Sequence, residues 1–276
     1  MKIWESILYA IVGGITELLP ISFSGHAAVL QNMFHMTPLT EGGGYYIRLA
    51  ITIGIILAII LAFPTEAGSS GQTLRIMRRP RRGERADRLQ ARTLLVSVFA
   101  LLPMLCSLFF LAAAERVNRL LYVAGFFALN GSFIYFCCRG AVGQRMERDI
   151  TIFDTLSIGF VRMLSVFPGL SSVGASLCIG RVRGLQVHCN ARLAYLLTLA
   201  FHIVSLIYHL PRALFYGSLS GTILLAFVLS ILFAAVFGYF ALQYFRYLLE
   251  QKKLNFFSYY CWDAAVITLI LSIINA

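Results

Sequence analysis

Charged side chains are scarce in this 276-residue chain. Asp, Glu, Lys and Arg together make up 13% of its residues, whereas hydrophobic residues make up 59%. A water-soluble domain carries roughly 25% charged residues, so half that share cannot cover a surface that faces water on every side. The composition excludes an ordinary soluble enzyme and predicts that most of the surface faces lipid.

Paired cysteines at the spacing of metal ligands are also missing. The six cysteines lie in or beside apolar segments, and the adjacent pair Cys137-Cys138 has no second pair at a matching spacing. Zinc sites need two such pairs or a pair with nearby histidines. We therefore expect the cysteines to behave as small buried apolar residues.

Negative charge is rarer than positive charge, and the formal net charge is +11. An excess of this size can indicate nucleic acid as a partner, but its distribution argues against that. The arginines between 75 and 92 form one cluster, which lies between two apolar segments. Such a cluster is typical of a cytoplasmic loop next to anionic lipid headgroups, so we expect the membrane as a partner and no nucleic acid.

Long apolar runs, in contrast, are abundant. A transmembrane helix needs ~20 consecutive apolar residues. The runs that meet this requirement are 45–63, 93–114, 119–138, 191–210, 218–245 and 256–275. The sequence therefore predicts an all-α polytopic membrane protein that forms a single membrane domain over 1–276.

Two further hydrophobic stretches, 4–34 and 152–185, are interrupted by helix breakers. The first contains Gly13-Gly14 and Pro20, and the second contains Pro168-Gly169. Broken backbone at membrane depth is tolerated only where protein or a water-filled cavity covers its free polar groups. We expect both stretches to form re-entrant helical hairpins.

The distribution of basic residues predicts the orientation. Most Lys and Arg residues lie in the loops 64–92, 139–151, 181–192 and 246–253. The positive-inside rule places these loops in the cytoplasm. Both termini are then predicted to be extracytoplasmic in a multi-pass protein.

The layout also predicts an inverted-topology repeat. The first repeat covers 1–138 and the second covers 150–276, with the basic cytoplasmic loop 64–92 inside the first; each half consists of one re-entrant hairpin plus three transmembrane helices. Because three is odd, the second half enters the membrane upside down. Paired broken segments in the two halves of such a repeat indicate a binding site near the midplane.

Ionisable groups at membrane depth are costly and usually functional. Around the first break these are Glu17 and His26, with Ser22 and Ser24 between them, and near the second break there is Arg162. The small and hydroxyl residues of the second break are Gly169, Ser171, Ser172, Gly174 and Ser176. Free backbone N–H groups and hydroxyls of this kind can hold phosphate, and a carboxylate can bind a divalent metal ion. The histidines 35, 188, 202 and 209 have no acidic or Cys partner at ligand spacing, so the sequence assigns them no role.

At these two segments the sequence resembles the bacitracin-resistance family of undecaprenyl-diphosphate phosphatases. The first motif runs from Glu5 to His26 and contains Gly-Ile-Thr-Glu-Leu-Leu-Pro-Ile-Ser-Phe-Ser-Gly-His. The second runs from Gly159 to Ser176 and contains Phe-Pro-Gly-Leu-Ser-Ser-Val-Gly-Ala-Ser. The spacing inside each motif matches without gaps, and the span layout matches over the whole chain.

The resemblance implies a function in cell-wall synthesis. Members of that family are acid-anhydride hydrolases of the bacterial cytoplasmic (inner) membrane, where they convert undecaprenyl diphosphate to the monophosphate and so recycle the lipid carrier. The implied cofactor is a divalent cation, Mg²⁺ or Ca²⁺, with Glu17 as its ligand. The implied partner is a polyprenyl phosphate or diphosphate lipid, and a homodimer is left open.

By this resemblance, the catalytic residues are Glu17, His26, Ser24 and Ser22. The residues that bind the substrate phosphate are Arg162, Ser171, Ser172, Ser176, Gly169 and Gly174. Arg162 stands where the family often has Gln, and it is expected either to pair with Glu17 or to replace a lost phosphate clamp.

Three positions depart from the family pattern. Gly13 stands where an acidic residue or Gln is usual, Phe23 where a second hydroxyl is usual, and Ser172 where an Arg grips the diphosphate. Loss of a charge clamp in phosphoryl transfer costs orders of magnitude in rate. The sequence therefore leaves two main hypotheses: a phosphatase with a rearranged site, or a non-catalytic polyprenyl-phosphate binding or transport protein on the same fold. A regulatory or scaffold subunit is a third reading without positive support.

Overall fold

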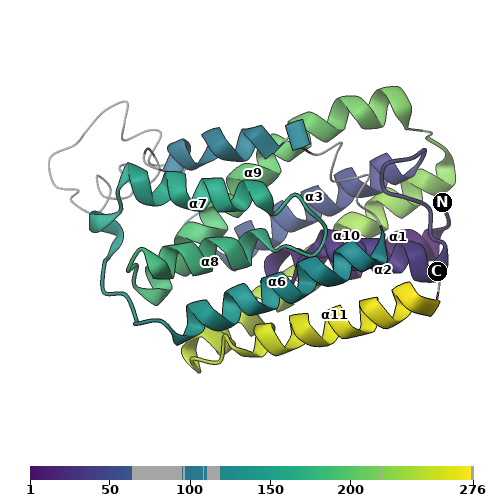
Figure 1. Cartoon of the computed structure of the whole chain (residues 1–276). Coiled ribbons are helices and arrows are strands. Elements are labelled where there is room, and N and C mark those ends of the chain that lie inside the picture. Colours follow the sequence, from purple (N-terminus) through teal and green to yellow (C-terminus); the bar gives the residue numbers. More distant parts are fainter. Residues whose placement is uncertain (64–94, 96, 108, 111–118, 218, 275–276) are drawn as a thin grey trace, which may run out of the picture.

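The structure is a computed structural model that describes residues 1–63, 95, 97–107, 109–110, 119–217 and 219–274 (Figure 1). Within these ranges the regular secondary structure is helical, apart from one isolated bridge between Arg145 and Leu185. The basic cluster predicted to form a cytoplasmic loop, and part of the predicted span 93–114, lie outside the described residues.

The first half of the chain contains α1 (Ile3–Leu18), α2 (Phe23–Phe34), α3 (Gly44–Ala62) and α6 (Leu120–Arg139). A shorter apolar helix, Ser97–Ser107, lies between α3 and α6 in the sequence. The second half contains α7 (Ile152–Leu164), α8 (Ser172–Val182), α9 (Val187–Tyr216), α10 (Gly221–Glu250) and α11 (Phe256–Ile274), preceded by the 3₁₀ turn Glu147–Asp149.

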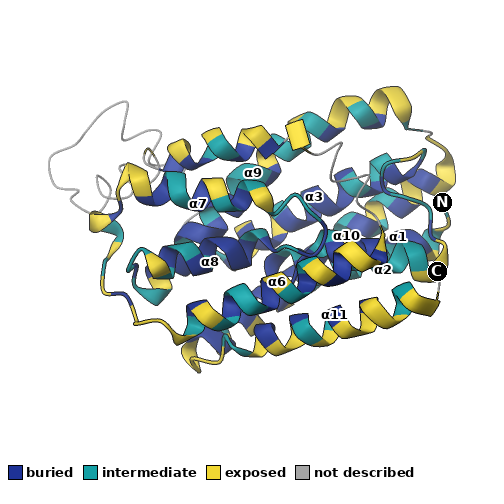
Figure 2. Ribbon diagram, in the orientation of Figure 1, coloured by how far each residue is buried: buried dark blue, intermediate teal, exposed yellow. Residues whose placement is uncertain are grey.

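In the described part of the chain, five helices are long and apolar enough to cross a membrane: α3, α6, α9, α10 and α11. They cover the spans predicted at 45–63, 119–138, 191–210, 218–245 and 256–275, so these predictions are confirmed. Large apolar side chains such as Phe109 and Phe215 are more than four-fifths exposed. Exposed residues run along the outer faces of the helices (Figure 2). A surface of this kind fits a multi-pass membrane protein.

Both breaks predicted from the sequence are present, and each has a local cause. Pro20 follows α1 and cannot donate a helical hydrogen bond; α2 then begins after Ser22, whose Oγ accepts from the N–H of Gly25. In the second break Gly169 has a φ of +111°, which favours glycine. Helix α8 begins after Ser171, whose Oγ accepts from the N–H of Gly174.

Small residues allow the helices to approach closely. Helices α1 and α3 both pack against α10, α9 packs against α3, and α6 packs against α11. A Cβ on Gly14 of α1 would lie 2.6 Å from the carbonyl oxygen of Ala234 in α10, and a Cβ on Gly159 of α7 would lie 2.3 Å from that of Ala100. Contacts this short exclude any side chain at the two glycines, and they bring the first helix of each broken segment into direct contact with an apolar helix of the other half.

A buried carboxylate holds the loop between α6 and α7 in place. Arg145 donates to Asp154 from Nη1 (3.1 Å) and Nη2 (2.7 Å), and Arg183 donates from Nε (2.6 Å). The Asp154 side chain is fully buried, and the backbone N–H of Thr151 also donates to it. Asp154 therefore joins the start of α7 to the end of α8, and its contacts assign it a structural role.

Candidate functional site

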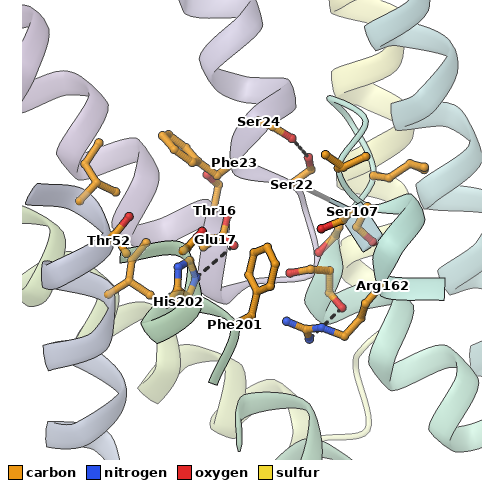
Figure 3. Close-up of a pocket in the computed structure, with 18 of the residues that line it drawn as sticks. Thr16, Glu17, Ser22, Phe23, Ser24, Thr52, Ser107, Arg162, Phe201 and His202 are labelled. Atoms are coloured by element: carbon orange, nitrogen blue, oxygen red, sulfur yellow. Dashed lines mark hydrogen bonds and ion pairs between the residues drawn. The ribbon is translucent and has the colours of Figure 1, made fainter. Parts of the chain in front are cut away.

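The two broken segments meet at a cavity of about 140 Å³ inside the bundle (Figure 3). Its wall includes parts of α1, α2, α3, α7, α8 and α9 together with both breaks. Much of this wall is polar, although the surrounding helices are apolar. Polar side chains at membrane depth usually mark a functional site, so this cavity is the candidate site.

The cavity brings together most of the residues that the sequence selected. Glu17, Ser22 and Ser24 line it from the first broken segment, and Arg162, Ser171 and Ser172 line it from the second. The other four selected residues do not line the cavity but contact residues that do. They are His26, Gly169, Gly174 and Ser176.

Ser22 joins the two breaks. Its Oγ accepts from the backbone N–H of Gly25 (3.4 Å) and of Gly169 (3.1 Å), and it shares a hydrogen bond with Ser24 Oγ (3.2 Å) (Figure 3). The backbones touch here, since a Cβ on Gly25 would lie 2.8 Å from Gly169 Cα. Ser22 itself has a φ of 70°, which is unusual for a residue with a side chain. The hydrogen bonds of the Ser22 hydroxyl hold the residue in this strained conformation, and such strain is common at functional turns.

Asn130 of α6 holds both breaks from behind. Its Nδ2 donates to the carbonyl oxygen of Pro20 (3.0 Å), and its Oδ1 accepts from the N–H of Ser171 (3.0 Å). The side chain is 2% exposed, so these backbone groups are satisfied away from water. Sequence reasoning did not select Asn130, although a lone Asn inside an apolar span is a detectable signal.

Arg162 is held in a fixed position at the cavity wall. Its Nη1 donates to Ser176 Oγ (2.7 Å) and to the carbonyl oxygen of Ser172 (3.2 Å), and its Nη2 donates to Thr198 Oγ1 (3.2 Å). The residue is 4% exposed, and its Nε has no hydrogen-bond partner among the described residues. A buried guanidinium with a spare donor beside a cavity suits an anionic ligand.

Glu17 pairs with a residue that the sequence did not select. Its Oε1 lies 3.3 Å from Nε2 of His202 in α9, and both side chains are largely buried (Figure 3). Within the described part of the chain, the ion pair of Glu17 is with His202 and not with Arg162. Of the two expectations for Arg162, the pairing with Glu17 that would close the site is therefore wrong, and the place of Arg162 on the cavity wall agrees with the other, a phosphate clamp.

The electrostatics of the cavity favour an anion. Helix α2 begins at Phe23 and α8 begins at Ser172, so two helix N-termini with their positive dipole ends meet at the wall. The lining also includes Arg48 and Arg162 but, among the described residues, a single carboxylate, Glu17. This arrangement suits a small phosphorylated group.

His26 is engaged on the other side of the first break. Its Nδ1 lies 2.7 Å from the carbonyl oxygen of Ser22, and its Nε2 lies 2.8 Å from the hydroxyl of Tyr260 in α11. The two rings stack at 5.7 Å. These contacts place His26 outside the cavity wall, next to Ser22, and its catalytic role stays a prediction.

Fold and site together define a multi-pass helical membrane protein with a polar-lined cavity between two broken segments. The family model described as "Bacitracin resistance protein BacA" matches residues 6–267. The chain therefore belongs to this family, which confirms the resemblance carried by the two motifs.

Curated relatives match along nearly the full length. Undecaprenyl-diphosphatase 1 of Shouchella clausii is 25% identical over 271 residues, covering 98% of this chain and 96% of the relative. An undecaprenyl-diphosphatase of Carboxydothermus hydrogenoformans is 25% identical, with 98% of each chain covered. Undecaprenyl-diphosphatase 3 of Bacillus cereus is 26% identical over 97% of this chain and 96% of its own.

Proposed function

We propose that this protein hydrolyses undecaprenyl diphosphate to the monophosphate in the bacterial inner membrane, as part of lipid-carrier recycling for cell-wall synthesis. Membership of the family and the names of its relatives support the substrate class. The observation that carries the proposal is the cavity itself. It places a carboxylate, Glu17, the hydroxyls of Ser22 and Ser24 and the guanidinium of Arg162 around one space of phosphate size.

The second broken segment binds the terminal phosphate in this proposal. Arg162 presents the charge of its guanidinium at the cavity wall, and the start of α8 contributes N–H groups and the hydroxyls of Ser171 and Ser172. Ser176 keeps the guanidinium in place through its 2.7 Å hydrogen bond. Gly169 and Gly174 hold the shape of the turn, and the Gly169 N–H also orients Ser22.

The first broken segment carries out the chemistry. The hydroxyl of Ser24 attacks the terminal phosphorus, its proton passes to Glu17, and the bond from phosphorus to the bridging oxygen breaks. Undecaprenyl phosphate leaves with the electron pair of that bond and takes up the proton. A water molecule, deprotonated in turn by Glu17, then attacks the phosphoserine and releases inorganic phosphate, which regenerates the Ser24 hydroxyl.

The cavity offers few ligands for the divalent cation that the family resemblance implies. Among the described residues no group of three or more His, Cys, Asp and Glu side chains could hold a metal ion. Glu17 is the only carboxylate among the described residues of the cavity wall, and it already contacts His202. Mg²⁺ and Ca²⁺ prefer several oxygen ligands, so no step above passes through a metal ion, and a metal at Glu17 stays a prediction.

The membrane arrangement is also proposed as an inverted repeat with two re-entrant hairpins. Its support is the matching placement of the motif glycines, Gly14 against α10 and Gly159 against helix Ser97–Ser107. Both termini lie at one end of the bundle, and the loops after α6, α8 and α10 lie at the other (Figure 1). With those loops basic, the positive-inside rule places the termini outside the cytoplasm.

Release of phosphate by purified protein tests the function. We expect wild type to release phosphate from undecaprenyl diphosphate and Glu17→Gln to lower kcat by about 10²–10⁴-fold, the range for loss of a general base. Glu250→Gln, at the exposed end of α10, is the matched control and should keep the wild-type rate. Equal rates for Glu17→Gln and wild type would remove Glu17 from the mechanism.

A smaller effect is expected at Tyr260. Tyr260→Phe removes one of the two partners of His26 but leaves the cavity wall intact. If His26 positions Ser22, kcat should fall by about threefold to tenfold, as for one neutral hydrogen bond worth about 1 kcal/mol, with the pH profile unchanged. A displaced pH profile would instead assign His26 a direct part in proton transfer.

A non-catalytic polyprenyl-phosphate binding or transport protein is the second candidate. The observation in its favour is Phe23, whose ring lines the cavity where relatives of this motif are expected to have a hydroxyl. The same assay separates the two functions. Binding of undecaprenyl phosphate without release of phosphate from the diphosphate would support the second candidate and contradict the first.

A further inference from the structure

Two departures in the first motif fit together in space. A Cβ on Gly13 would lie 2.9 Å from Cγ2 of Ile51 and 3.2 Å from Cε2 of the Phe23 ring. Gly13 lies one helical turn before Glu17 on the same face of α1. The space beside Glu17 that a second carboxylate would enter is therefore filled by a methyl group and a phenyl ring, which offer a metal ion no ligand.

The positive charge near Glu17 comes from protein side chains instead. His202 Nε2 lies 3.3 Å from Glu17 Oε1, and the Arg162 guanidinium is held by Ser176 and Thr198 with its Nε unpaired. Both side chains line the cavity and are nearly fully buried. Imidazole is a poor ligand for Mg²⁺ and Ca²⁺, and a dication here would compete with His202 for the same carboxylate.

We propose that the phosphate site of this protein works without a divalent cation, with Arg162 supplying the positive charge and His202 a ring N–H donor to the terminal phosphate of a polyprenyl diphosphate. The inference rests on the proposed function, and it adds how the charge of the bound diphosphate is neutralised. Phosphoryl transfer requires such neutralisation whatever group provides it. Arg162 binds the phosphate oxygens, while His202, beside Glu17 on the same cavity wall, donates from its ring.

The first test compares phosphate release in excess EDTA with release in Mg²⁺, Ca²⁺ or Mn²⁺. We expect the rates to agree within about threefold, because loss of a required metal ion costs several orders of magnitude. A rate that appears only with a divalent cation would overturn the inference and keep the proposed phosphatase function.

A second readout does not need turnover. Binding of inorganic pyrophosphate to the purified protein, measured by calorimetry in EDTA, should have the same affinity as binding with Mg²⁺ present. If no condition gives phosphate release, the proposed function fails, and this measurement still decides the inference. Pyrophosphate binding that depends on a divalent cation would then overturn it.

Two variants assign the role of His202. His202→Gln should lower phosphate release and pyrophosphate affinity in EDTA by at least about tenfold, as expected for loss of one buried donor to a charged phosphate. His188→Gln, at the exposed start of α9, is the matched control and should behave as wild type. An unchanged His202→Gln variant would exclude His202 from the site.

Restoring the carboxylate position provides a gain-of-function test. Gly13→Glu combined with Phe23→Ser opens the space now filled by the ring and places a second carboxylate near Glu17. We expect release by this double variant to be stimulated at least about tenfold by Mg²⁺. Should the double variant not fold, the EDTA comparison and the pyrophosphate measurement on wild type still decide the proposal.

Discussion

Replacing Arg162 with alanine is expected to lower kcat/KM for phosphate release by about 10²–10³-fold, the cost of removing one preorganised charged donor from a transition state. Arg162 is the one arginine of the second broken segment on the cavity wall. Its Nη atoms are fixed by Ser176 and Thr198, so the guanidinium needs no rearrangement when charge develops on the phosphate.

The loss should reflect chemistry and not folding. Without the guanidinium, Ser176 Oγ still donates to the carbonyl oxygen of Ser172, and Thr198 Oγ1 still donates to that of Ala194. Both hydroxyls therefore keep a partner inside the bundle. Thermal unfolding in detergent should show an Arg162→Ala protein that folds like wild type.

Arg162→Lys distinguishes charge from geometry. A lysine ammonium keeps the positive charge but lacks the planar fork, so it cannot contact Ser176, Thr198 and a phosphate together. We expect it to recover only part of the lost activity. Arg139→Ala, an exposed arginine at the end of α6, is the control and should leave the rate unchanged. Full activity in Arg162→Ala would contradict the assignment of the clamp.

The second large effect is expected on stability, at Asp154. Asp154→Ala should destabilise the protein by about 1–3 kcal/mol, because the hydrogen-bond donors of Arg145 and Arg183 lose their acceptor, although both guanidinium groups remain partly exposed to water. Arg145 and Arg183 both donate to this fully buried carboxylate. Thermal unfolding in detergent measures the change. The exposed Asp149, 3.8 Å from Arg148, provides the control, and Asp149→Asn should cost less than about 1 kcal/mol.

The same cluster predicts a pH dependence. Burial by itself raises the pKa of Asp154, but the hydrogen bonds from Arg145, Thr151 and Arg183 outweigh it and lower the pKa below its usual range. A lowered pKa in the folded state means that the stabilisation is complete above the unfolded value of about 3.9 and is lost as the pH falls below it. Wild type should therefore lose stability below about pH 4, and Asp154→Ala should show a flatter profile there. Parallel profiles for the two proteins would contradict this role.

The apolar spans could be predicted because lipid imposes a simple rule on the sequence. A helix that crosses a bilayer must be long and apolar, so α3, α6, α9, α10 and α11 follow from hydropathy alone. The breaks also have local causes, since Pro20 lacks a backbone N–H and Gly169 allows a positive φ. The cavity residues of the two broken segments were found for a related reason, because a charged or hydroxyl-rich stretch is unusual inside an apolar segment.

The partners of those residues could not be read from the sequence. Glu17 and His202 lie far apart in the chain, and nothing at local spacing joins them. Asn130 links Pro20 to Ser171 only because α6 packs behind both breaks. His26 was selected as a catalyst by its motif, yet its contacts with Ser22 and Tyr260 place it behind the wall.

The sequence by itself determined that this protein is a helical membrane protein with two broken segments and which polar residues those segments contain. These properties depend on composition and on breaker residues, which act over one or two helical turns. Only the tertiary structure decided that the two segments meet at one cavity, that His202 contacts Glu17, and that the Phe23 ring fills the space beside Gly13. Such contacts depend on how distant helices pack, and packing is set by shape complementarity over the whole bundle.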